Sequence, residues 1–343
     1  MTGTSNAVPR VACVLPPSAD FPKYARFAEE LGYTRVWAFD SPALYGDVWI
    51  ALARAAEATE CIGLATGVAV PFSRHVMVTA SAIASVAELA PGRLACAFGT
   101  GFSAAKALGR KPAKWSEMRT FMTRLRGLLN GDIVDIDGAM CRMLHSPGFA
   151  PPRPIDVPLY LAPIGPKGLA AARDLADGVI LAVPHAVSGW QTAALLVSGT
   201  VLDSGESHET PRVVDAFGPG FATGIHAMWE WRLFDMIRDL PGGSEWLDTL
   251  ADIPENQRHL AVHEGHLVVV SDRDKAIVQQ AGPRLLENTW SGSPDVIRKR
   301  AEGLAHQGVS EIVYNPTGSD IYRELATFAQ AMEPEQAKSS IQT

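Results

Sequence analysis

The sequence lacks paired cysteines, long apolar runs and a positive charge balance. Its four cysteines stand far apart with no CxxC pair, so we expect them to be small buried side chains. No uncharged apolar run of 18 residues occurs, and the opening MTGTSNAVPR has no signal-peptide pattern, so we expect a cytoplasmic protein with no membrane contact. The 30 Lys and Arg against 37 Asp and Glu form no basic stripe, which excludes a generic nucleic-acid binder.

The composition is that of a globular enzyme. The chain has 343 residues, of which 47% are apolar and 20% charged, so it can bury a sizeable core. The chain is about twice as long as a usual domain, which suggests two domains, but a single barrel domain can also be this long. We expect one domain over residues 8–332, with loose tails at 1–7 and 333–343.

Short apolar segments alternate with amphipathic ones along most of the chain. The apolar runs lack the alternation of half-exposed strands, which indicates a parallel sheet covered on both faces. Helices are expected near 21–31, 47–60, 75–90 and 115–129, a β-hairpin at 133–143, and a helical insertion at 218–262 near the seventh strand. Eight strands favour a closed (β/α)₈ barrel, a TIM barrel, over an open sheet; they are expected at 11–15, 35–39, 62–70, 93–98, 158–162, 178–183, 212–217 and 311–314.

One glycine motif offers a competing interpretation. Residues 99–104 read G-x-G-x-x-A after a strand, with Glu117 near the acidic position of a dinucleotide-binding fingerprint. That fingerprint belongs to the first strand of its domain, whereas this motif follows three complete βα units, and Pro112 interrupts the segment after it. The barrel interpretation instead places Gly99 and Gly101 at the end of the fourth strand, where a flat ring can approach the backbone.

An ordered set of motifs resembles the bacterial luciferase-like superfamily, most closely its methylenetetrahydromethanopterin reductase branch. A strand ending Thr66-Gly67-Val68 is followed by a proline turn and Arg74-His75, then by Gly92-Arg93 and the glycine turn at 99–101. Later come PLYLAPIGPK at 158–167 and ADGV at 176–179. The order covers residues 8–332 and is more specific than any single motif.

The resemblance implies a TIM barrel that binds coenzyme F420 or FMN at the carboxyl ends of its strands. It also implies a non-prolyl cis peptide bond at Gly67-Val68, beside the flavin ring, and a homodimer. An FMN enzyme would need a separate flavin reductase. The residues at the family's cofactor positions are Gly67, Val68, Ala69, Gly99, Thr100, Gly101, Ile164, Gly165, Pro166, Lys167, Val183 and His185.

The departures from the family pattern concern its chemistry. Where the family often has Asp-His or Glu-His after the second strand, this chain has Asp40-Ser41. We therefore expect Asp40 and Ser41 at the catalytic position, without the imidazole. Ile164 replaces a serine near the cofactor, and Val76 replaces the proline after His75.

An acidic chain must gather cations locally to bind an anionic cofactor. We expect Arg74, Lys167 and His185 to serve this purpose, since each follows a strand of the barrel. His259, His263 and His266 have helical spacing, but no HExxH motif occurs. We expect no metal there and interpret them as a polar lining on the substrate side.

The resemblance implies an oxidoreductase that transfers hydride between F420 and a small organic substrate. Two alternatives remain open at this point. One is a monooxygenase that uses reduced FMN and O₂ in the same pocket. The other is a barrel without cofactor that acts as a binding protein, which the substitutions at Ser41 and Ile164 make worth testing.

Overall fold

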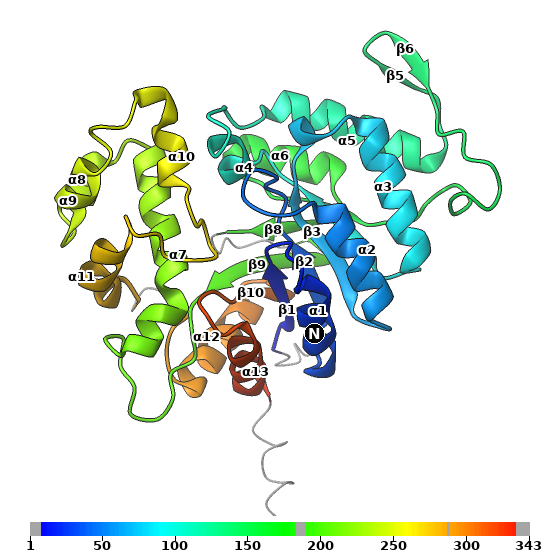
Figure 1. The fold of residues 1–343 in the computed structure, drawn as a ribbon. Coiled ribbons are helices and arrows are strands. Elements are labelled where there is room, and N and C mark those ends of the chain that lie inside the picture. Colours follow the sequence, from blue (N-terminus) through cyan, green and yellow to red (C-terminus); the bar gives the residue numbers. More distant parts are fainter. Residues whose placement is uncertain (1–7, 183–188, 287–288, 334–343) are drawn as a thin grey trace, which may run out of the picture.

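A closed parallel barrel forms the centre of the molecule. The computed structural model describes residues 8–182, 189–286 and 289–333 (Figure 1). Strand order around the barrel is β1-β10-β9-β8-β7-β4-β3-β2, which confirms the predicted (β/α)₈ class. The strands are β1 (Arg10–Leu15), β2 (Arg35–Ala38), β3 (Gly63–Ala69), β4 (Leu94–Phe98), β7 (Leu159–Leu161), β8 (Gly178–Leu181), β9 (Thr192–Ser198) and β10 (Glu311–Asn315).

Helices cover the outside of the barrel, as the alternating pattern predicts. Asp47 caps one of them by accepting hydrogen bonds from the backbone N–H groups of Trp49 and Ile50, and Pro22 occupies the first turn of another. The expected hairpin is present as β5 (Val134–Ile136) and β6 (Ala139–Cys141). The covering helices are α1 (Phe21–Glu30), α2 (Val48–Ala58), α3 (Val76–Leu89), α5 (Trp115–Asn130), α6 (Gly165–Leu175), α12 (Pro294–His306) and α13 (Ile321–Met332).

The prediction for the seventh strand is wrong. Residues 212–217 belong to helix α7 (Pro211–Glu230), and the seventh strand is β9. The six-residue window is apolar enough for a buried strand, but Val213, Phe217, Phe221 and Ile225 recur every four residues and form one buried helical face. The longer period decides in favour of the helix.

The glycine motif at 99–101 also needs a correction. A short helix, α4 (Phe102–Lys106), does begin directly after Gly101, although the sequence gives little sign of it. Gly101 has φ +74°, a left-handed conformation that glycine adopts without strain. Because the motif ends the fourth strand of a closed barrel, the dinucleotide-binding interpretation is excluded by topology.

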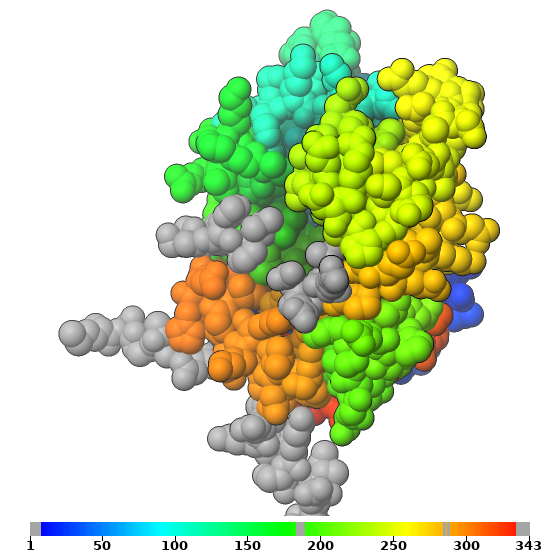
Figure 2. Space-filling model, turned by 90° about the vertical axis from the view of Figure 1, so that its left-hand side faces the viewer, coloured from blue at the N-terminus to red at the C-terminus, as the bar shows by residue number. Residues whose placement is uncertain are grey.

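The predicted helical insertion lies between β9 and β10 and has its own hydrophobic core. Trp246, 2% exposed, packs in that core with Phe217 and Ile237. Figure 1 shows the insertion beside the barrel, and Figure 2 shows that it forms much of one face of the molecule. It extends beyond 218–262 in both directions and contains α7, α8 (Phe234–Arg238), α9 (Gly243–Asp248), η2 (Glu255–Gln257), α10 (Arg258–Val262) and α11 (Lys275–Leu286).

An ion-pair network ties the base of the insertion to α13. Arg212 donates from Nε to Oε1 of Glu206 (2.6 Å) and from Nη1 to Oε1 of Glu324 (3.4 Å), and Arg323 also donates to Glu324 (2.7 Å). Glu324 is 2% exposed and accepts a hydrogen bond from Tyr314 Oη. The network therefore holds α7 and α13 in a fixed relation.

We expect this network to make stability depend on acidic pH. Hydrogen bonds from Arg212 lower the pKa of Glu206 from 4.5 to about 2, so its contribution is complete above about pH 4.5 and is lost as the pH falls toward 2. Between pH 4.5 and pH 2, the unfolding free energy of Glu206→Gln, measured with urea, should fall by about 1 kcal/mol less than that of the wild type. Glu209→Gln, an exposed neighbour, should behave like the wild type. Equal losses in Glu206→Gln and the wild type would contradict this assignment.

The termini and two internal positions give no outcome for their predictions. The expected tails at 1–7 and 333–343 lie outside the described residues, except for Glu333. The predicted cofactor residues Val183 and His185 also lie outside them. Within the described part of the chain, no helix is both long enough and apolar enough to span a bilayer.

Candidate functional site

A cavity of about 210 Å³ lies at the carboxyl ends of β2, β3, β4 and β7. Four separate segments build it, each directly following a strand, as in barrel enzymes generally. It brings together eight residues that the sequence predicts for the site: Asp40, Ser41, Gly67, Val68, Gly99, Thr100, Gly101 and Ile164. It also includes Phe39, Val70, Phe102 and Ser103, which the motifs do not single out, and Ala104 and Ala162, which belong to the G-x-G-x-x-A and PLYLAPIGPK motifs.

The end of β3 has the backbone conformation that the resemblance predicts. The Gly67-Val68 peptide bond is cis, and the pairing of β3 with β4 shifts register between Thr66 and Ala69. Ala69 is buried and is not among the residues that line the cavity, whereas Val68 does line it.

The glycines of the site make room for protein side chains. A Cβ on Gly99 would lie 2.7 Å from Cγ2 of Val68, and one on Gly101 would lie 2.5 Å from Cγ1 of Val70. A Cβ on Gly67 would lie 3.1 Å from Cβ of Trp37, inside the barrel. The sequence analysis expects these glycines to let a flat ring approach the backbone. In the structure they instead let β3 and β4 approach each other, and the two strand ends form the cavity wall.

Asp40 is fixed by ionic and backbone hydrogen bonds. Nη1 of Arg74 lies 3.0 and 2.8 Å from its two carboxylate oxygens, and the N–H of Val70 donates to Oδ2 at 3.1 Å. Burial raises the pKa of Asp40, against the opposing effect of Arg74. Both oxygens are thus occupied, and the carboxylate links the end of β2 to the end of β3.

The same bonds correct the expectation for Arg74. Its second terminal nitrogen, Nη2, pairs with Asp47 at 2.7 Å, so two carboxylates neutralise one guanidinium. Burial raises the pKa of Asp47, but the hydrogen bonds from Arg74 and the backbone outweigh it, so the pKa is lowered. Arg74 therefore orients the strand ends and is not available as a free cation for an anionic cofactor.

Asp40→Asn should destabilise the fold more than the neighbouring substitution Asp47→Asn. Removing the Asp40 charge leaves Arg74, 14% exposed, with a single ionic partner, and we expect unfolding free energy to fall by about 3 kcal/mol. Asp47 is 39% exposed, and an asparagine there still accepts the α2 cap bonds, so its loss should be about 1 kcal/mol or less. Urea unfolding of both variants measures the difference. Equal losses would show that the Asp40 pair does not hold the strand ends.

Three hydroxyl-bearing residues line the cavity. Ser41 and Thr100 are at most 9% exposed, and the carbonyl of Ser41 accepts hydrogen bonds from the N–H groups of Leu44 and Tyr45. Ser103, in the first turn of α4, was missed by the motif analysis because it occupies a variable position of the glycine pattern. With Asp40 occupied, these hydroxyls are side-chain groups of the lining that can donate a hydrogen bond.

A cleft of about 590 Å³ adjoins the cavity on the side of the β4–α5 loop. The two share a wall, because the carbonyl of Thr100 accepts a hydrogen bond from Ala113 and Gly101 packs against Phe72. Exposed cations line this cleft: Arg110, which also lies over the Phe72 ring at 5.7 Å, Lys111 and Lys114. We call these three residues the basic cluster. The residue motifs gave no sign of it, since loop positions carry no periodicity.

The start of α6 continues this positively charged region. A Cβ on Gly168 would lie 2.6 Å from Cζ2 of Trp115, so α6 and α5 touch at their first turns. Lys167 is exposed there, in the first turn of the helix, where the sequence predicts it. Gly165 and Pro166 are exposed in the same turn and do not line the 210 Å³ cavity. Within the described residues, neither Lys167 nor the basic cluster pairs with a carboxylate.

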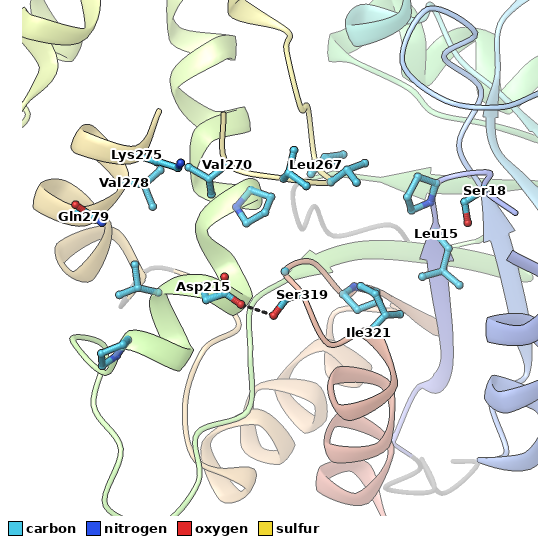
Figure 3. A pocket seen from close by; sticks show the side chains of 18 of the residues that line it. Leu15, Ser18, Asp215, Leu267, Val270, Lys275, Val278, Gln279, Ser319 and Ile321 are labelled. Carbon is cyan, nitrogen blue, oxygen red and sulfur yellow. Dashed lines mark hydrogen bonds between the residues drawn. The ribbon is translucent and has the colours of Figure 1, made fainter. Parts of the chain in front are cut away.

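A second, larger cavity of about 1190 Å³ separates the barrel from the insertion. It opens beyond the carboxyl ends of β1 and β10, next to Leu15 and Ser319, and α7 and α11 cover its other side (Figure 3). Its wall is mainly apolar, and its polar groups include the Asp215–Ser319 pair, in which Ser319 donates at 2.6 Å.

The histidines of the insertion are arranged differently from the prediction. Helix α10 ends at Val262, so helical spacing does not place His259, His263 and His266 on one face. His259 instead lies against Gly109, while His263 and His266 meet His226 of α7. His226 was not singled out because it lies about forty residues away in the sequence.

The family model described as luciferase-like monooxygenase matches residues 2–311. The 5,10-methylenetetrahydromethanopterin reductase of Methanolobus tindarius is 34% identical over 174 residues, covering 47% of this chain and 49% of that protein. The F420-dependent hydroxymycolic acid dehydrogenase of Mycobacterium tuberculosis is 28% identical over 188 residues, covering 46% and 51%. The chain spans about half the length of the curated relatives it matches.

A solved structure agrees over nearly the whole length. The coenzyme F420 dependent tetrahydromethanopterin reductase of Methanopyrus kandleri superposes with a TM-score of 0.63, covering 96% of this chain and 99% of that one. Its sequence identity is 17%, so this likeness shows the shared barrel fold alone.

Proposed function

The chain belongs to the luciferase-like monooxygenase family, and from this premise we propose that it is an oxidoreductase that uses coenzyme F420. The reaction is hydride transfer between the cofactor and a small organic substrate. The observation that carries the proposal is the cavity at β2–β4 and β7 with the basic cluster directly beside it. The F420-dependent name of the hydroxymycolic acid dehydrogenase, a relative over about half of this chain, supports the same cofactor.

The residues present fit a deazaflavin with an acidic side chain. F420 carries a phosphodiester followed by glutamate carboxylates, whereas FMN ends in one phosphate. Val68 and Ile164 supply apolar walls for a ring, and the start of α6 with Lys167 suits the phosphate. The basic cluster beyond Trp115 suits the carboxylates. One phosphate would leave that cluster without a ligand, which favours F420 over FMN.

When bound, F420 supplies a ring carbon that accepts or donates a hydride. The chain's own residues orient the reactants and control the proton. We assign Ser41 Oγ the role of hydrogen-bonding the substrate oxygen, at the position where the family often has an imidazole. Asp40 is a positioning residue, because its carboxylate is occupied by Arg74 and Val70.

We propose that the substrate enters from the 1190 Å³ cavity between the insertion and the barrel. Its mainly apolar wall, with Asp215 and Ser319 at one side, suits an organic molecule with an apolar body and a polar group. Barrel enzymes gain specificity from segments at this end of the strands, and the insertion follows the seventh strand.

The test is a parallel titration of the purified full chain with F420 and with FMN, followed by cofactor fluorescence. We expect F420 to bind at micromolar concentration and FMN at least tenfold more weakly. Tight binding of FMN alone would instead support the reduced-FMN monooxygenase. Binding of neither cofactor would support the barrel without cofactor, and either result overturns the proposal.

A further inference from the structure

Three histidines converge inside the insertion, outside the cavity assigned to the cofactor. His226 comes from α7, His263 directly follows α10, and His266 lies three residues further on. Their exposed fractions are 1%, 3% and 5%, so all three imidazoles are withdrawn from solvent. One ring nitrogen from each lies within 4.8 Å of the others.

The distances between these nitrogens fit a tetrahedral ion. Nδ1 of His266 lies 3.4 Å from Nδ1 of His226 and 3.4 Å from Nδ1 of His263. Two nitrogens bound to one tetrahedral zinc at 2.0–2.1 Å are about 3.3 Å apart. The two pairs that include His266 therefore match shared coordination to within about 0.1 Å, and the third pair of nitrogens lies within 4.8 Å.

Carboxylates orient two of the imidazoles from behind. Nε2 of His226 lies 3.3 Å from Oδ2 of Asp274, and Nε2 of His263 lies 3.1 Å from Oε1 of Glu230. Because a carboxylate only accepts hydrogen bonds, Nε2 of His226 and Nε2 of His263 each carry the proton. The Nδ1 atom of each ring then has a free lone pair that faces His266. Metal-binding histidines are commonly held in this way.

The carboxylates are themselves anchored by neighbouring elements. Trp246 Nε1 donates to Asp274 at 2.7 Å, and Ser271 Oγ donates to its other oxygen at 2.7 Å. Lys106 of α4 pairs with Glu230 at 2.8 Å. The outer groups are thus fixed before any ion binds, as in a preorganised site.

Without a cation, the nitrogens that face one another are mismatched. The Nδ1 atoms of His226 and His263 both accept, and the single Nδ1 of His266 can donate to at most one of them linearly. A divalent cation satisfies all three lone pairs at once.

We propose that His226, His263 and His266 bind a divalent transition-metal ion through Nδ1. Imidazole ligands suit zinc, copper, nickel or iron, whereas magnesium and calcium require oxygen ligands. A cavity of about 570 Å³, lined by His263, His266 and Leu44, gives the ion a route to the site and room for a fourth ligand.

The ion would lie inside the insertion, close to its contact with the barrel. Its ligands come from α7 and from the segment after α10, and Glu230 connects them to Lys106 of α4. Because α4 also lines the candidate cofactor cavity, the site joins the two halves of the molecule. The inference does not depend on the identity of the cofactor.

Zn²⁺ and Co²⁺ are the probes. Chelator-treated full chain is titrated with Zn²⁺ against a chromogenic chelator, and Co²⁺ is added in parallel to record the visible spectrum. We expect one equivalent of Zn²⁺ per chain, an intense tetrahedral Co²⁺ spectrum, and loss of both in His226→Gln and His266→Gln. His259→Gln, outside the cluster, should bind like the wild type.

If a histidine variant fails to fold, Glu230→Gln provides a second test of metal binding. It keeps all three ligands but removes the anion behind His263, and should weaken Zn²⁺ binding about 10- to 100-fold. The proposal is overturned if Glu230→Gln binds Zn²⁺ as tightly as the wild type. It is also overturned if the wild type binds no more tightly than folded His226→Gln, or if His259→Gln loses as much affinity.

Discussion

Reversing the charge of the basic cluster should weaken F420 binding by about 100-fold. Arg110, Lys111 and Lys114 are exposed, so each ion pair with a cofactor carboxylate contributes at most about 1 kcal/mol. Changing all three to glutamate replaces attraction by repulsion, and about 2.7 kcal/mol in total corresponds to a 100-fold increase in Kd. Fluorescence titration at low ionic strength measures this increase, and added salt should reduce it.

The control keeps the net charge of that variant but moves the substitutions elsewhere. Arg26, Arg238 and Lys299 line neither the 210 Å³ cavity nor the cleft, and their reversal should change the Kd by less than about threefold. If both variants lose affinity equally, the effect arises from overall charge, and the assignment of the cluster to the acidic side chain is wrong.

Gly99→Ala should destabilise the protein and deform the cavity wall. Its Cβ would lie 2.7 Å from Cγ2 of Val68, so β3 and β4 must separate at the site, and we expect unfolding free energy to fall by about 2 kcal/mol. F420 affinity should fall with it, because both residues line the cavity.

The companion variant Val68→Ala removes the side chain that meets the new methyl group. The double variant Gly99→Ala with Val68→Ala should therefore regain at least about 1 kcal/mol relative to the sum of the single changes. Urea unfolding of the four proteins completes the cycle. Strict additivity would mean that the strand ends do not make this contact in solution.

Sequence reasoning reached the barrel because its strands are short, buried and separated by helices of clear period. It failed at residues 212–217, where six apolar-rich residues suit a strand or a helix, and only the four-residue recurrence through Ile225 distinguishes them. It also passed over β9 (Thr192–Ser198), an apolar segment that the motifs do not mark.

The candidate site was predictable where motifs mark strand ends. Gly67, Val68 and the 99–101 turn were located in this way, and the structure brings them into one cavity with Asp40 and Ser41. The ionic partners of Arg74 were not predictable, because Asp40 and Asp47 lie about thirty residues away and meet it only in the closed barrel. Convergence of His226 on His266 depends on tertiary packing in the same way.

A crystal structure of the full chain with F420 tests the central claim most directly. We predict the ring between Val68, Ile164 and the 99–101 turn, with Ser41 Oγ facing it and the acidic side chain passing Lys167 toward Arg110, Lys111 and Lys114. Density for the cofactor at any other cavity of the molecule, or FMN retained from expression in place of F420, would contradict the account.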